Sequence, residues 1–320
     1  MTLTSVIRST GSFLPARILT NKELETIVDT TDEWIVQRTG IEERHIAAKD
    51  EPTSFLAINA AKNALESSGL RPEDIDGVIV ATTTPDQSFP SVAVKVQAAL
   101  DLKPGPAFDV QAVCSGFIYA LSVADSMIRS GSMNRVMVVG AEKMSSLLDW
   151  TDRSTCVLFG DGAGAVILEK SEQEAQGILS THLYANGRLN DLLYTDGGVS
   201  TSGTAGHIIM HGKEVFKNAV TLMADIVEEV LTKNNVSPEN IDWLIPHQAN
   251  LRIITGTAEK LGMSMDRVVV TVNKHGNTSA ASIPLALDDA VRSGKVQRGQ
   301  LLLLEALGGG LTWGAALIRF

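Results

Sequence analysis

The strongest constraint on the fold is an internal repeat that relates the two halves of the chain. The segment ALESSGLRPEDIDGVIVATTTP at 64–85 parallels VLTKNNVSPENIDWLIPHQAN at 230–250, and NRVMVVGAEKM is echoed in the same way by GQLLLLEALGGG. The offset is about 165 residues, much longer than the roughly 20–50 residues of a solenoid repeat. The chain is therefore predicted to be a duplicated α/β fold, with its halves at 1–172 and 173–320.

Within each half, short apolar runs alternate with amphipathic segments. GVIVATT at 77–83 and VMVVG at 136–140 are continuous apolar runs, which are typical of strands covered on both faces. The segment 54–69 has helical spacing, with Ser54 as its predicted N-cap and Gly69 as its predicted stop. We expect the two halves to pack their sheets around shared central helices, with the site between the halves near the carboxyl ends of strands.

Charge and composition exclude several classes of protein. The formal net charge of −10 argues against nucleic-acid binding, which needs a basic face, although one local basic patch is still allowed. The N-terminal segment lacks the apolar core of a secretion signal, and no apolar run approaches membrane length. Two cysteines do not form a disulfide framework. We expect reduced thiols and a cytoplasmic protein that binds neither nucleic acid nor membrane.

Cys114 is the candidate nucleophile, because FDVQAVCSGF places it between a buried strand and a helix-like stretch. A buried structural cysteine is the plainer reading, since a free thiol packs like a small hydrophobe. A helix N-terminus, however, favours the thiolate through unpaired N–H groups and the helix dipole. Ser115 and Gly116 are small enough to let a substrate approach. Cys156, in the strand-like run STCVLFG, is predicted to be structural.

Two loops after apolar strands in the second half offer partners for this thiol. IDWLIPHQAN ends a buried run at His247, and VVVTVNKHGNTSAASIP ends another at Asn277, although His275 competes with His247 for the role. His207 and His211 have no carboxylate or thiol ligands nearby, so a metal site is not expected there. The glycines of GDGAGA lack the context of a dinucleotide fingerprint and are predicted to serve close packing. Those of GGGLTWG form either a turn alone or a turn whose N–H groups reach the site.

These motifs together resemble the β-ketoacyl-acyl carrier protein synthase III family of thiolase-like condensing enzymes. The matching stretches are DVQAVCSGF, PHQAN, HGNTSAASIP and GGGLTWG, with further similarity from GSFLP and DEWIVQRTGIEERHI to the last residue. The resemblance implies a five-layered αβαβα thiolase-like fold and a homodimer. It also implies condensation of a short acyl-CoA, usually acetyl-CoA, with malonyl-acyl carrier protein, giving a 3-oxoacyl-acyl carrier protein, CO2 and CoA.

The resemblance also implies roles for individual residues. Cys114, His247 and Asn277 would be catalytic, and the N–H groups of Cys114 and Gly309 would form the oxyanion hole. CoA is a substrate here, and no metal or redox cofactor is expected. The implied CoA contacts are Trp34, Arg38, Arg153, Gly212, Phe216, Ala249 and Asn250. The implied carrier-protein contacts are Lys217, Gln248, Ala249, Asn250, Leu251, Arg252 and Lys260. The implied acyl-pocket residues are Phe89, Phe159, Met210 and Leu307.

The chain departs from the family pattern at one place, and four other functions are compatible with parts of the sequence. Many relatives read EAFGGGFTWG at the end, whereas this chain has Leu307 and Leu311, which affects the shape of the pocket. A Cys-His-Asn set is also found in papain-like hydrolases, where the histidine abstracts the thiol proton. Closer rivals are a polyketide starter synthase and a 3-hydroxy-3-methylglutaryl-CoA synthase. The intact Cys-His-Asn set argues against a noncatalytic partner protein.

Overall fold

The first half of the chain forms a five-stranded mixed sheet. The computed structural model describes residues 3–173 and 175–320, so the first two residues of the predicted N-terminal half lie outside the described residues. Three strands run parallel at one side of this sheet, and two antiparallel strands follow. The strand order is β1 (Thr4–Phe13), β7 (Asp161–Ser171), β6 (Arg135–Lys143), β4 (Gly77–Ala81) and β5 (Ala107–Val110).

The second half repeats this arrangement. Its sheet has the order β8 (Gly177–Ala185), β13 (Thr312–Arg319), β12 (Leu301–Gly308) and β11 (Trp243–Pro246). These strands correspond one for one to β1, β7, β6 and β4. At the position of β5, the second half has only an isolated parallel bridge between Leu244 and Val268. The duplication predicted from the sequence is therefore present in the topology, and the chain crosses from one sheet to the other between Ser171 and Gly177.

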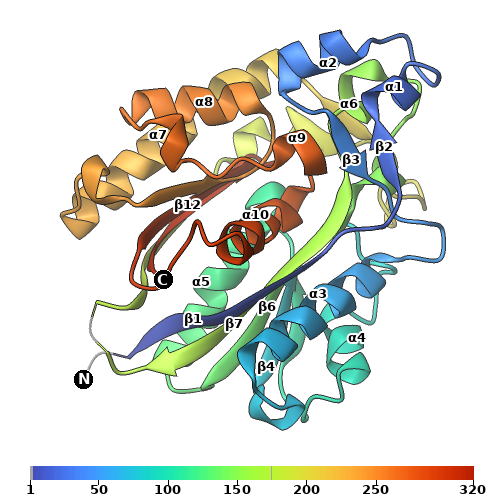
Figure 1. Cartoon of the computed structure of the whole chain (residues 1–320). Coiled ribbons are helices and arrows are strands. Elements are labelled where there is room, and N and C mark those ends of the chain that lie inside the picture. The colour runs from blue at the N-terminus through green and yellow to red at the C-terminus, as the bar shows by residue number, and fades with distance from the viewer. Residues whose placement is uncertain (1–2, 174) are drawn as a thin grey trace.

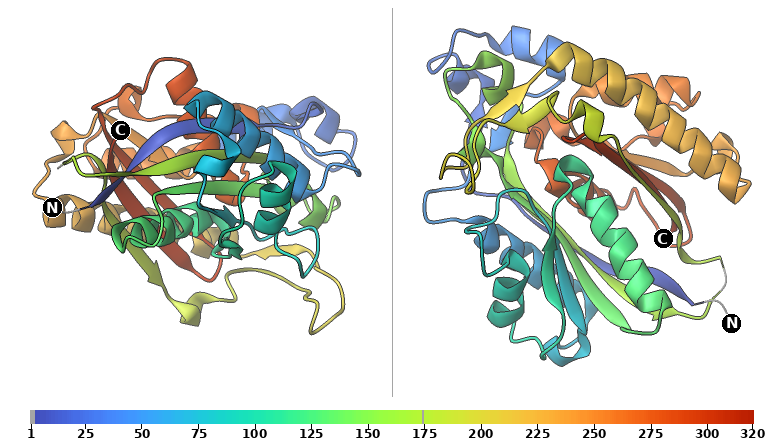
Figure 2. Two further views of the ribbon diagram at one scale, coloured as in Figure 1. Left: turned by 90° about the horizontal axis from the view of Figure 1, so that it is seen from below. Right: turned by 180° about the vertical axis from the view of Figure 1, so that it is seen from behind.

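Helices complete five layers around the two sheets (Figures 1 and 2). The outer face of the first sheet is covered by α3 (Thr53–Ser68) and α4 (Val92–Ala99). Between the sheets lie α5 (Gly116–Arg129) and α10 (Ser282–Arg292), and the outer face of the second sheet is covered by α7 (Gly212–Asn234) and α8 (Leu251–Lys260). The predicted αβαβα arrangement is confirmed.

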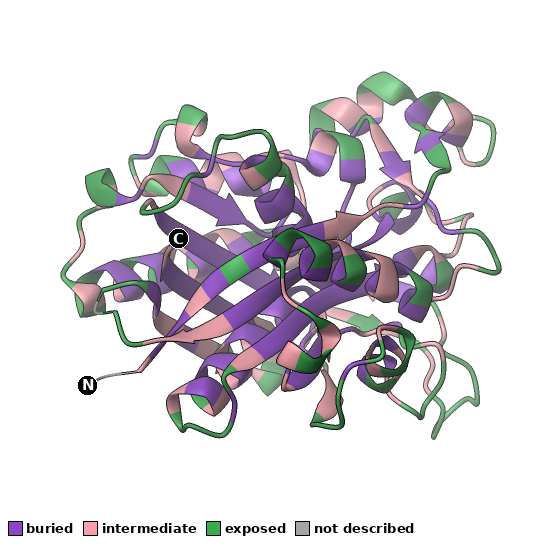
Figure 3. Ribbon diagram, turned by 60° about the horizontal axis from the view of Figure 1, so that its bottom comes forward, coloured by how far each residue is buried: buried purple, intermediate pink, exposed green. Residues whose placement is uncertain are grey.

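The inner layers of the molecule are tightly packed, with buried strands in both sheets and glycines where a helix approaches a strand closely. The strands of both sheets are the most continuously buried part of the chain (Figure 3). Glycines let α10 approach the first sheet closely: a Cβ on Gly140 would lie 2.2 Å from the Ala280 carbonyl oxygen, and one on Gly164 would lie 2.6 Å from the Leu285 nitrogen. Gly164 belongs to GDGAGA, so the prediction of close packing for that motif is correct.

One local prediction was wrong in detail. Helix α3 begins at Thr53, and its N-cap is Pro52, which offers no side-chain cap. The backbone N–H of Ser54 instead donates to the Asp86 carboxylate at 2.8 Å, so a residue from a distant loop satisfies the helix start. The helix stops as predicted at Gly69, whose φ of 69° is the left-handed conformation that favours glycine.

The remaining short elements gather largely at the end of the molecule where β4, β5 and β6 finish (Figure 1). Their bounds are β2 (Ile18–Thr20), α1 (Asn21–Leu24), α2 (Asp32–Thr39), β3 (Glu43–His45), α6 (Arg153–Cys156), β9 (Leu193–Thr195), β10 (Ile208–Met210) and α9 (Val272–His275). Buried Arg44 joins two of these regions by donating to the carbonyl oxygens of Leu19 and Val157. Within the described residues, no helix is both long and apolar enough to cross a membrane.

Candidate active site

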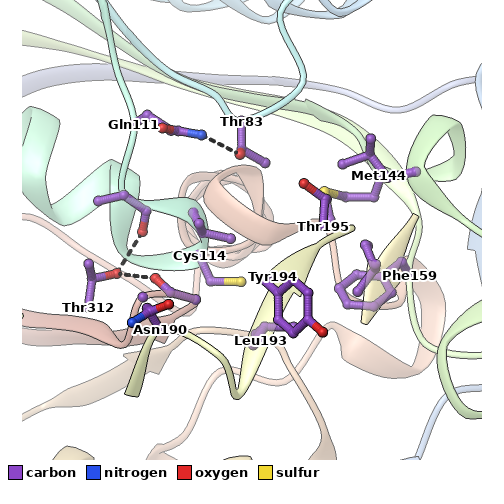
Figure 4. A pocket seen from close by; sticks show the side chains of 16 residues that line it. Thr83, Gln111, Cys114, Met144, Phe159, Asn190, Leu193, Tyr194, Thr195 and Thr312 are labelled. Carbon is purple, nitrogen blue, oxygen red and sulfur yellow. Dashed lines mark hydrogen bonds between the residues drawn. The ribbon is translucent and has the colours of Figure 1, made fainter. Parts of the chain in front are cut away.

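Cys114 lies in a tight turn between a strand and a helix, as the sequence predicts. Strand β5 ends at Val110, a single 3-10 turn spans Val113–Ser115, and α5 begins at Gly116. Val113 has a φ of 48°, which is a rare conformation for a β-branched residue and costs about 1–3 kcal/mol. This turn leads the chain from the strand into the helix and leaves the sulfur of Cys114 facing a cavity (Figure 4).

The glycine hairpin between β12 and β13 packs directly against this turn. A Cβ on Gly308 would lie 2.6 Å from the Cys114 nitrogen, so only glycine fits there. Gly309 lines the same cavity as Cys114. Thr312 ties the hairpin to the turn, because its hydroxyl donates to the Ala112 carbonyl at 2.9 Å (Figure 4). The motif GGGLTWG is therefore a turn that also reaches the site, which decides between the two readings that the sequence left open.

Two cavities meet at Cys114. One has a volume of about 370 Å³ and extends from the cysteine past Phe159 toward β9 and the loops that follow β4 and β6. The other has a volume of about 120 Å³ and runs between the second sheet and helices α7 and α8. Cys114 and Phe159 line both cavities. The thiol can therefore contact groups that enter from either side.

His247 and Asn277 line the smaller cavity together with Cys114. His247 directly follows β11, and its backbone N–H donates to the Glu305 carbonyl at 2.8 Å. Asn277 follows α9 and forms an isolated parallel bridge with Phe159. The structure thus brings the three predicted residues together. His275, the competing histidine, does not line either cavity and instead packs edge-on to another histidine.

Hydrogen bonds fix the orientation of both partner side chains. The Oδ1 of Asn277 accepts the backbone N–H of Ser279 at 2.9 Å, so its Nδ2 group is the part that remains for the cavity. The Nδ1 of His247 lies 2.7 Å from the Ser282 hydroxyl oxygen, which also accepts the backbone N–H of Gln248 at 3.3 Å. Among the described residues, Nδ1 is the acceptor within reach of the Ser282 hydroxyl proton, so this hydroxyl donates to Nδ1. His247 then carries its proton on Nε2.

Burial sets the protonation states of this pair. It raises the pKa of Cys114 to about 12 and lowers the pKa of His247 to about 3. Burial therefore opposes the expected effect of the helix start on the thiolate, because a buried anion loses its hydration. At neutral pH the site contains a thiol beside a neutral imidazole.

Glu142 is a site residue that sequence reasoning missed. It lies near the end of β6, is fully buried, and accepts the backbone N–H groups of Thr83 and Thr84 at 3.1 Å. The hydroxyl of Ser279 donates to its Oε1 at 3.1 Å, and the turn that begins at Ser279 packs against the turn that carries Cys114. Burial raises the pKa of Glu142 to about 7. No motif marked this residue, because its partners come from two separate segments, 82–84 and the turn at Ser279.

The predicted CoA contacts fall into two groups, a stacked cluster around Trp34 and a set that lines the smaller cavity, called the tunnel below. The guanidinium carbons of Arg38 and Arg153 lie 4.5 Å and 4.8 Å from the centre of the Trp34 ring, as expected for cation–π contacts. Arg153 also donates to the Asp29 carbonyl. The other four predicted residues line the smaller cavity: Gly212, Phe216, Ala249 and Asn250.

The predicted carrier-protein contacts differ in exposure and do not form one surface. Lys217 and Arg252 are exposed, and Arg252 lies 5.6 Å from the ring of Phe216 beside the tunnel. Gln248 is buried, and its amide bonds only to backbone groups, so its assignment to a surface contact is wrong. Lys260 is exposed but lies two turns further along α8, about 12 Å away, beside the acidic side chains of a separate groove. Leu251 and its neighbours Ala249 and Asn250 are half-buried.

The predicted acyl-pocket residues do not all line the same cavity. Phe159 lines both cavities, whereas Met210 and Leu307 line only the smaller cavity, the one that contains the predicted CoA-arm residues. The structure therefore does not place Met210 and Leu307 in the same cavity as the residues beyond Phe159, and their role in an acyl pocket stays a prediction. Phe89 is 81% exposed and lines neither cavity, so it is not a core aromatic of its own chain. Several lining residues of the larger cavity were missed: Thr83, Gln111, Met144, Leu147, Leu193, Thr195 and Ile208.

Three other sequence predictions can be compared with the structure. Cys156 is fully buried, as expected for a structural thiol, although it ends helix α6 and does not lie on a strand. Leu307 and Leu311 are both buried in one apolar cluster with Ala219 and Met223 of α7. Across residues 3–173 and 175–320, no group of three histidine, cysteine, aspartate or glutamate side chains is arranged to hold a metal ion.

Comparison with known proteins gives a consistent result. Two models of 3-oxoacyl-[acyl-carrier-protein] synthase III match residues 108–187 and 231–320, the latter being its C-terminal part. The β-ketoacyl-[acyl-carrier-protein] synthase III of Rhodospirillum centenum is 60% identical over 323 residues, covering 100% of both chains. The crystal structure of 3-oxoacyl-[acyl-carrier-protein] synthase III from Aquifex aeolicus superposes with a TM-score of 0.94 at 53% identity, covering 99% of this chain and 100% of that one.

An enzyme of polyketide synthesis is also similar to this chain. The priming β-ketosynthase of the R1128 polyketide pathway has a TM-score of 0.93 at 36% identity, covering 99% of this chain and 96% of that chain. The identity is higher for the two synthase III relatives named above, whose alignments cover 99–100% of this chain. Fold, site geometry and whole-length similarity agree, and the chain belongs to the 3-oxoacyl-[acyl-carrier-protein] synthase III family.

Proposed function

We propose that this protein catalyses the initiating condensation of type II fatty-acid synthesis. A short acyl group, such as acetyl, passes from CoA to Cys114, and malonyl-acyl carrier protein then loses CO2 and attacks it. The products are a 3-oxoacyl-acyl carrier protein, CO2 and free CoA. The observation that carries this proposal is that Cys114 lies where two cavities meet, with His247 and Asn277 lining one of them. The site can therefore hold an acyl group on one side and a second thioester on the other.

In the first half-reaction, Cys114 attacks the acyl-CoA carbonyl and keeps the acyl group. A covalent intermediate divides one difficult step into two easier ones. The backbone N–H groups of Cys114 and Gly309 are the proposed donors to the oxyanion, and the close packing at Gly308 supports this arrangement. Donors of this kind contribute about 10²–10³-fold each in rate.

In the second half-reaction, His247 and Asn277 hold the thioester oxygen of malonyl as negative charge develops. Both present N–H donors to the cavity, through Nε2 of the histidine and Nδ2 of the asparagine. The neutral state of His247 suits donation, because a protonated imidazole is not needed for a hydrogen bond. An amide therefore suffices at position 277, where no proton has to be abstracted.

Trp34, Arg38 and Arg153 are the proposed binding group for the adenine and phosphates of CoA. Two guanidinium groups on one indole ring supply both positive charge and a flat stacking surface. The pantetheine arm would follow the smaller cavity past Phe216 and Asn250 to Cys114. CoA and its thioester are substrates in this proposal, and no step requires a metal or redox cofactor.

Arg252 and Lys217 are the proposed docking patch for the acidic carrier protein at the mouth of the tunnel. Reversing Arg252 to glutamate should weaken the use of malonyl-acyl carrier protein about tenfold or more, with much less effect on acylation by acetyl-CoA. The effect of the native patch should shrink with added salt, since exposed charges are screened over about 10 Å at 0.1 M. Initial rates with each substrate at several salt concentrations measure this.

Lys295→Glu is a matched control for this charge reversal. Lys295 is also exposed, but it lies before the start of β12, at the opposite end of that strand from the site. It should leave both half-reactions unchanged. Equal losses with both substrates in Arg252→Glu would place Arg252 in the CoA tunnel or in the fold and not in carrier-protein docking.

A homodimer is proposed, with β5 and the loop that carries Phe89 at its interface. β5 is the edge strand of the first sheet, and an unpaired edge is a surface that another strand can join. Phe89 is 81% exposed, and the loop that carries it begins beside Thr83, which lines the larger cavity. In a dimer, Phe89 would reach the partner's acyl pocket and close it.

Phe89→Ala tests this assignment of the acyl pocket. A ring at the pocket floor excludes long chains, because packed interiors yield little to oversized groups. The wild type is expected to take acetyl- and butyryl-CoA, and the variant should extend this range toward octanoyl-CoA. Competition among the three acyl-CoAs, measured by intact mass on Cys114, gives the ranking. Phe55→Ala, at a partly exposed aromatic on the outer helix α3, is the matched control. A folded, dimeric Phe89→Ala with the wild-type ranking would refute the role.

A polyketide-type starter condensation is the second candidate, because a priming β-ketosynthase shares the fold over nearly the whole chain. A 3-hydroxy-3-methylglutaryl-CoA-type reaction would use CoA-bound partners throughout. Supplying acetyl-CoA with either malonyl-acyl carrier protein or malonyl-CoA separates these reactions. The proposed function requires carrier-bound malonyl and yields CO2 and a 3-oxoacyl product. A cytoplasmic location stays a prediction.

A further inference from the structure

We propose that Glu142 accepts, through the hydroxyl of Ser279, the proton that Cys114 loses when its sulfur attacks the acyl thioester. This inference rests on the proposed function, since it assigns the activation step of the same cysteine. Glu142 does not touch the substrate in this arrangement. It is a positioning residue for the proton, acting through Ser279.

The three side chains lie in one buried cluster. The hydroxyl of Ser279 donates to Glu142 Oε1 at 3.1 Å, and the turn Ser279–Ala281 packs against the turn Val113–Ser115 that carries Cys114. Glu142 and Ser279 are fully buried, and Cys114 is only 4% exposed. Ser279 is held in place by its own backbone, whose N–H donates to Asn277 and whose φ of 49° is left-handed. One hydroxyl can therefore accept the thiol proton while passing its own to the carboxylate.

His247 is poorly suited to take this proton. Its Nδ1 is occupied by the Ser282 hydroxyl, and its Nε2 carries a proton and can only donate. Burial also lowers the pKa of His247 to about 3, far below the pKa of about 12 of the thiol. The pKa of Glu142, about 7, is closer to that of the thiol and to neutral pH. The carboxylate is thus the better matched base.

Few charged groups face Glu142 from the elements packed around it. The neighbouring Lys143 on β6 donates its ammonium to two backbone carbonyls of the loop before α3. Asp161 on β7 is occupied by backbone N–H groups and a serine hydroxyl. The loop after β4 contributes only N–H and hydroxyl donors from 82–84. Cys114 is the titratable group whose charge couples to Glu142. Gaining a proton therefore removes an anion beside the reacting sulfur.

The proton and electron balance of this step is simple. As the sulfur of Cys114 bonds to the acyl carbon, its proton moves to the Ser279 oxygen, and the Ser279 proton moves to Oε1 of Glu142. The bond between the acyl carbon and the CoA sulfur then breaks, and its electron pair leaves with that sulfur. The resulting thiolate takes up the proton that Glu142 gives up. The products are the acyl-cysteine, CoA thiol and an ionised Glu142.

Glu142→Gln tests the inference while preserving size and the acceptor for the threonine N–H groups. Two rates are measured between pH 5.5 and 9.5 by intact mass: acylation of Cys114 by acetyl-CoA in a single turnover, and its alkylation by iodoacetamide. In the wild type, both rates should fall as pH drops through about 7, because protonated Glu142 cannot accept a proton. In the variant, acylation at pH 7.5 should slow about 100-fold. The fall of both rates below pH 7, the acidic limb of the pH profile, should disappear.

Three further variants separate this role from a structural one. Ser279→Ala breaks the relay but keeps the backbone bond to Asn277, so it should also lose the acidic limb. Glu142→Asp keeps a carboxylate and should recover part of the rate together with the limb. Asp125→Asn is the matched control, because Asp125 is a buried, hydroxyl-bonded carboxyl on α5, about 14 Å along the helix axis from Gly116. It should keep the wild-type profile.

The outcomes distinguish this inference from the proposed function. If acetyl-CoA does not acylate the wild type, the proposed function fails, and the alkylation profiles still report on the relay. If the wild type is acylated and Glu142→Gln, folded by its melting temperature, shows the wild-type rate and acidic limb, the relay is refuted. A slower Glu142→Gln that keeps the acidic limb would also contradict it, because the limb would then belong to another group.

Discussion

Cys114→Ala is expected to show no acyl adduct with any acyl-CoA and no condensation above background. The reason is geometric: in the described chain, Cys114 is the cysteine that lines the two cavities, and the other cysteine, Cys156, lies in a separate core cluster. Without the sulfur, the oxyanion donors have no intermediate to stabilise. Alanine is close in size to cysteine, so the fold should persist. Intact mass after incubation with acetyl-CoA, together with a condensation assay, measures both losses.

Cys156→Ala is the matched control, because it removes the other buried thiol of the chain. It should keep the adduct and the condensation, with at most a modest loss of stability. Peptide mapping of the wild-type adduct should place the acyl group on Cys114. An adduct on Cys156, or normal condensation by Cys114→Ala, would overturn the assignment of the nucleophile.

His247→Ala and Asn277→Ala are expected to separate the two half-reactions. Both variants should still be acylated by acetyl-CoA, because their donors act on the malonyl oxygen. Release of CO2 from malonyl-acyl carrier protein should fall by about 10²–10³-fold in each, which is the range for removing one donor to a developing oxyanion. Acylation is read by intact mass, and decarboxylation by CO2 release under identical conditions.

His275→Ala is the control for these variants, since it removes the nearby histidine that lines neither cavity. It should leave the ratio of acylation to decarboxylation unchanged. Loss of acylation with decarboxylation intact, in either His247→Ala or Asn277→Ala, would reverse the roles assigned here. Such a result would also favour a hydrolase-like pair in which His247 deprotonates the thiol.

The fold could be predicted because it repeats within one sequence. Two copies of a helix, an acidic turn and a buried strand require the same local structure twice, and the structure has matching strand orders in both sheets. The strand–turn–helix around Cys114 and the strand ends before His247 and Asn277 are local patterns, so they too could be inferred. What the pattern could not show is the left-handed Val113, which no composition rule anticipates in a β-branched residue.

The parts that prediction missed depend on contacts between distant segments. Glu142 and Ser279 are 137 residues apart and meet only because β6 and the turn before α10 pack together. Gln248 stands inside the PHQAN motif beside His247, yet its side chain faces inward and bonds to backbone groups. A motif identifies a segment but does not say which of its side chains face the ligand. The larger cavity is likewise assembled from several loops, so no single stretch could mark it.

The thiol pKa shows a competition that the sequence cannot resolve. A helix N-terminus lowers a thiol pKa, and burial raises it, and only the depth of the sulfur decides the sum. Cys114 is 4% exposed, and its burial raises the pKa of the thiol to about 12. Leu307 and Leu311 are easier to interpret, because both are buried in one apolar cluster, and Leu307 lines the smaller cavity.

The central claim is that an acyl group held on Cys114 is the one that condenses with carrier-bound malonyl. The most direct measurement loads the wild type with isotope-labelled acetyl-CoA, removes free CoA, and then adds malonyl-acyl carrier protein alone. Mass spectrometry follows the labelled acetyl on Cys114 and on the carrier protein while CO2 is counted. We predict that the label leaves Cys114 and appears in a 3-oxoacyl-acyl carrier protein, with one CO2 released for each acetyl transferred. Recovery of the label as free acetate, with no labelled carrier-bound product, would contradict the claim.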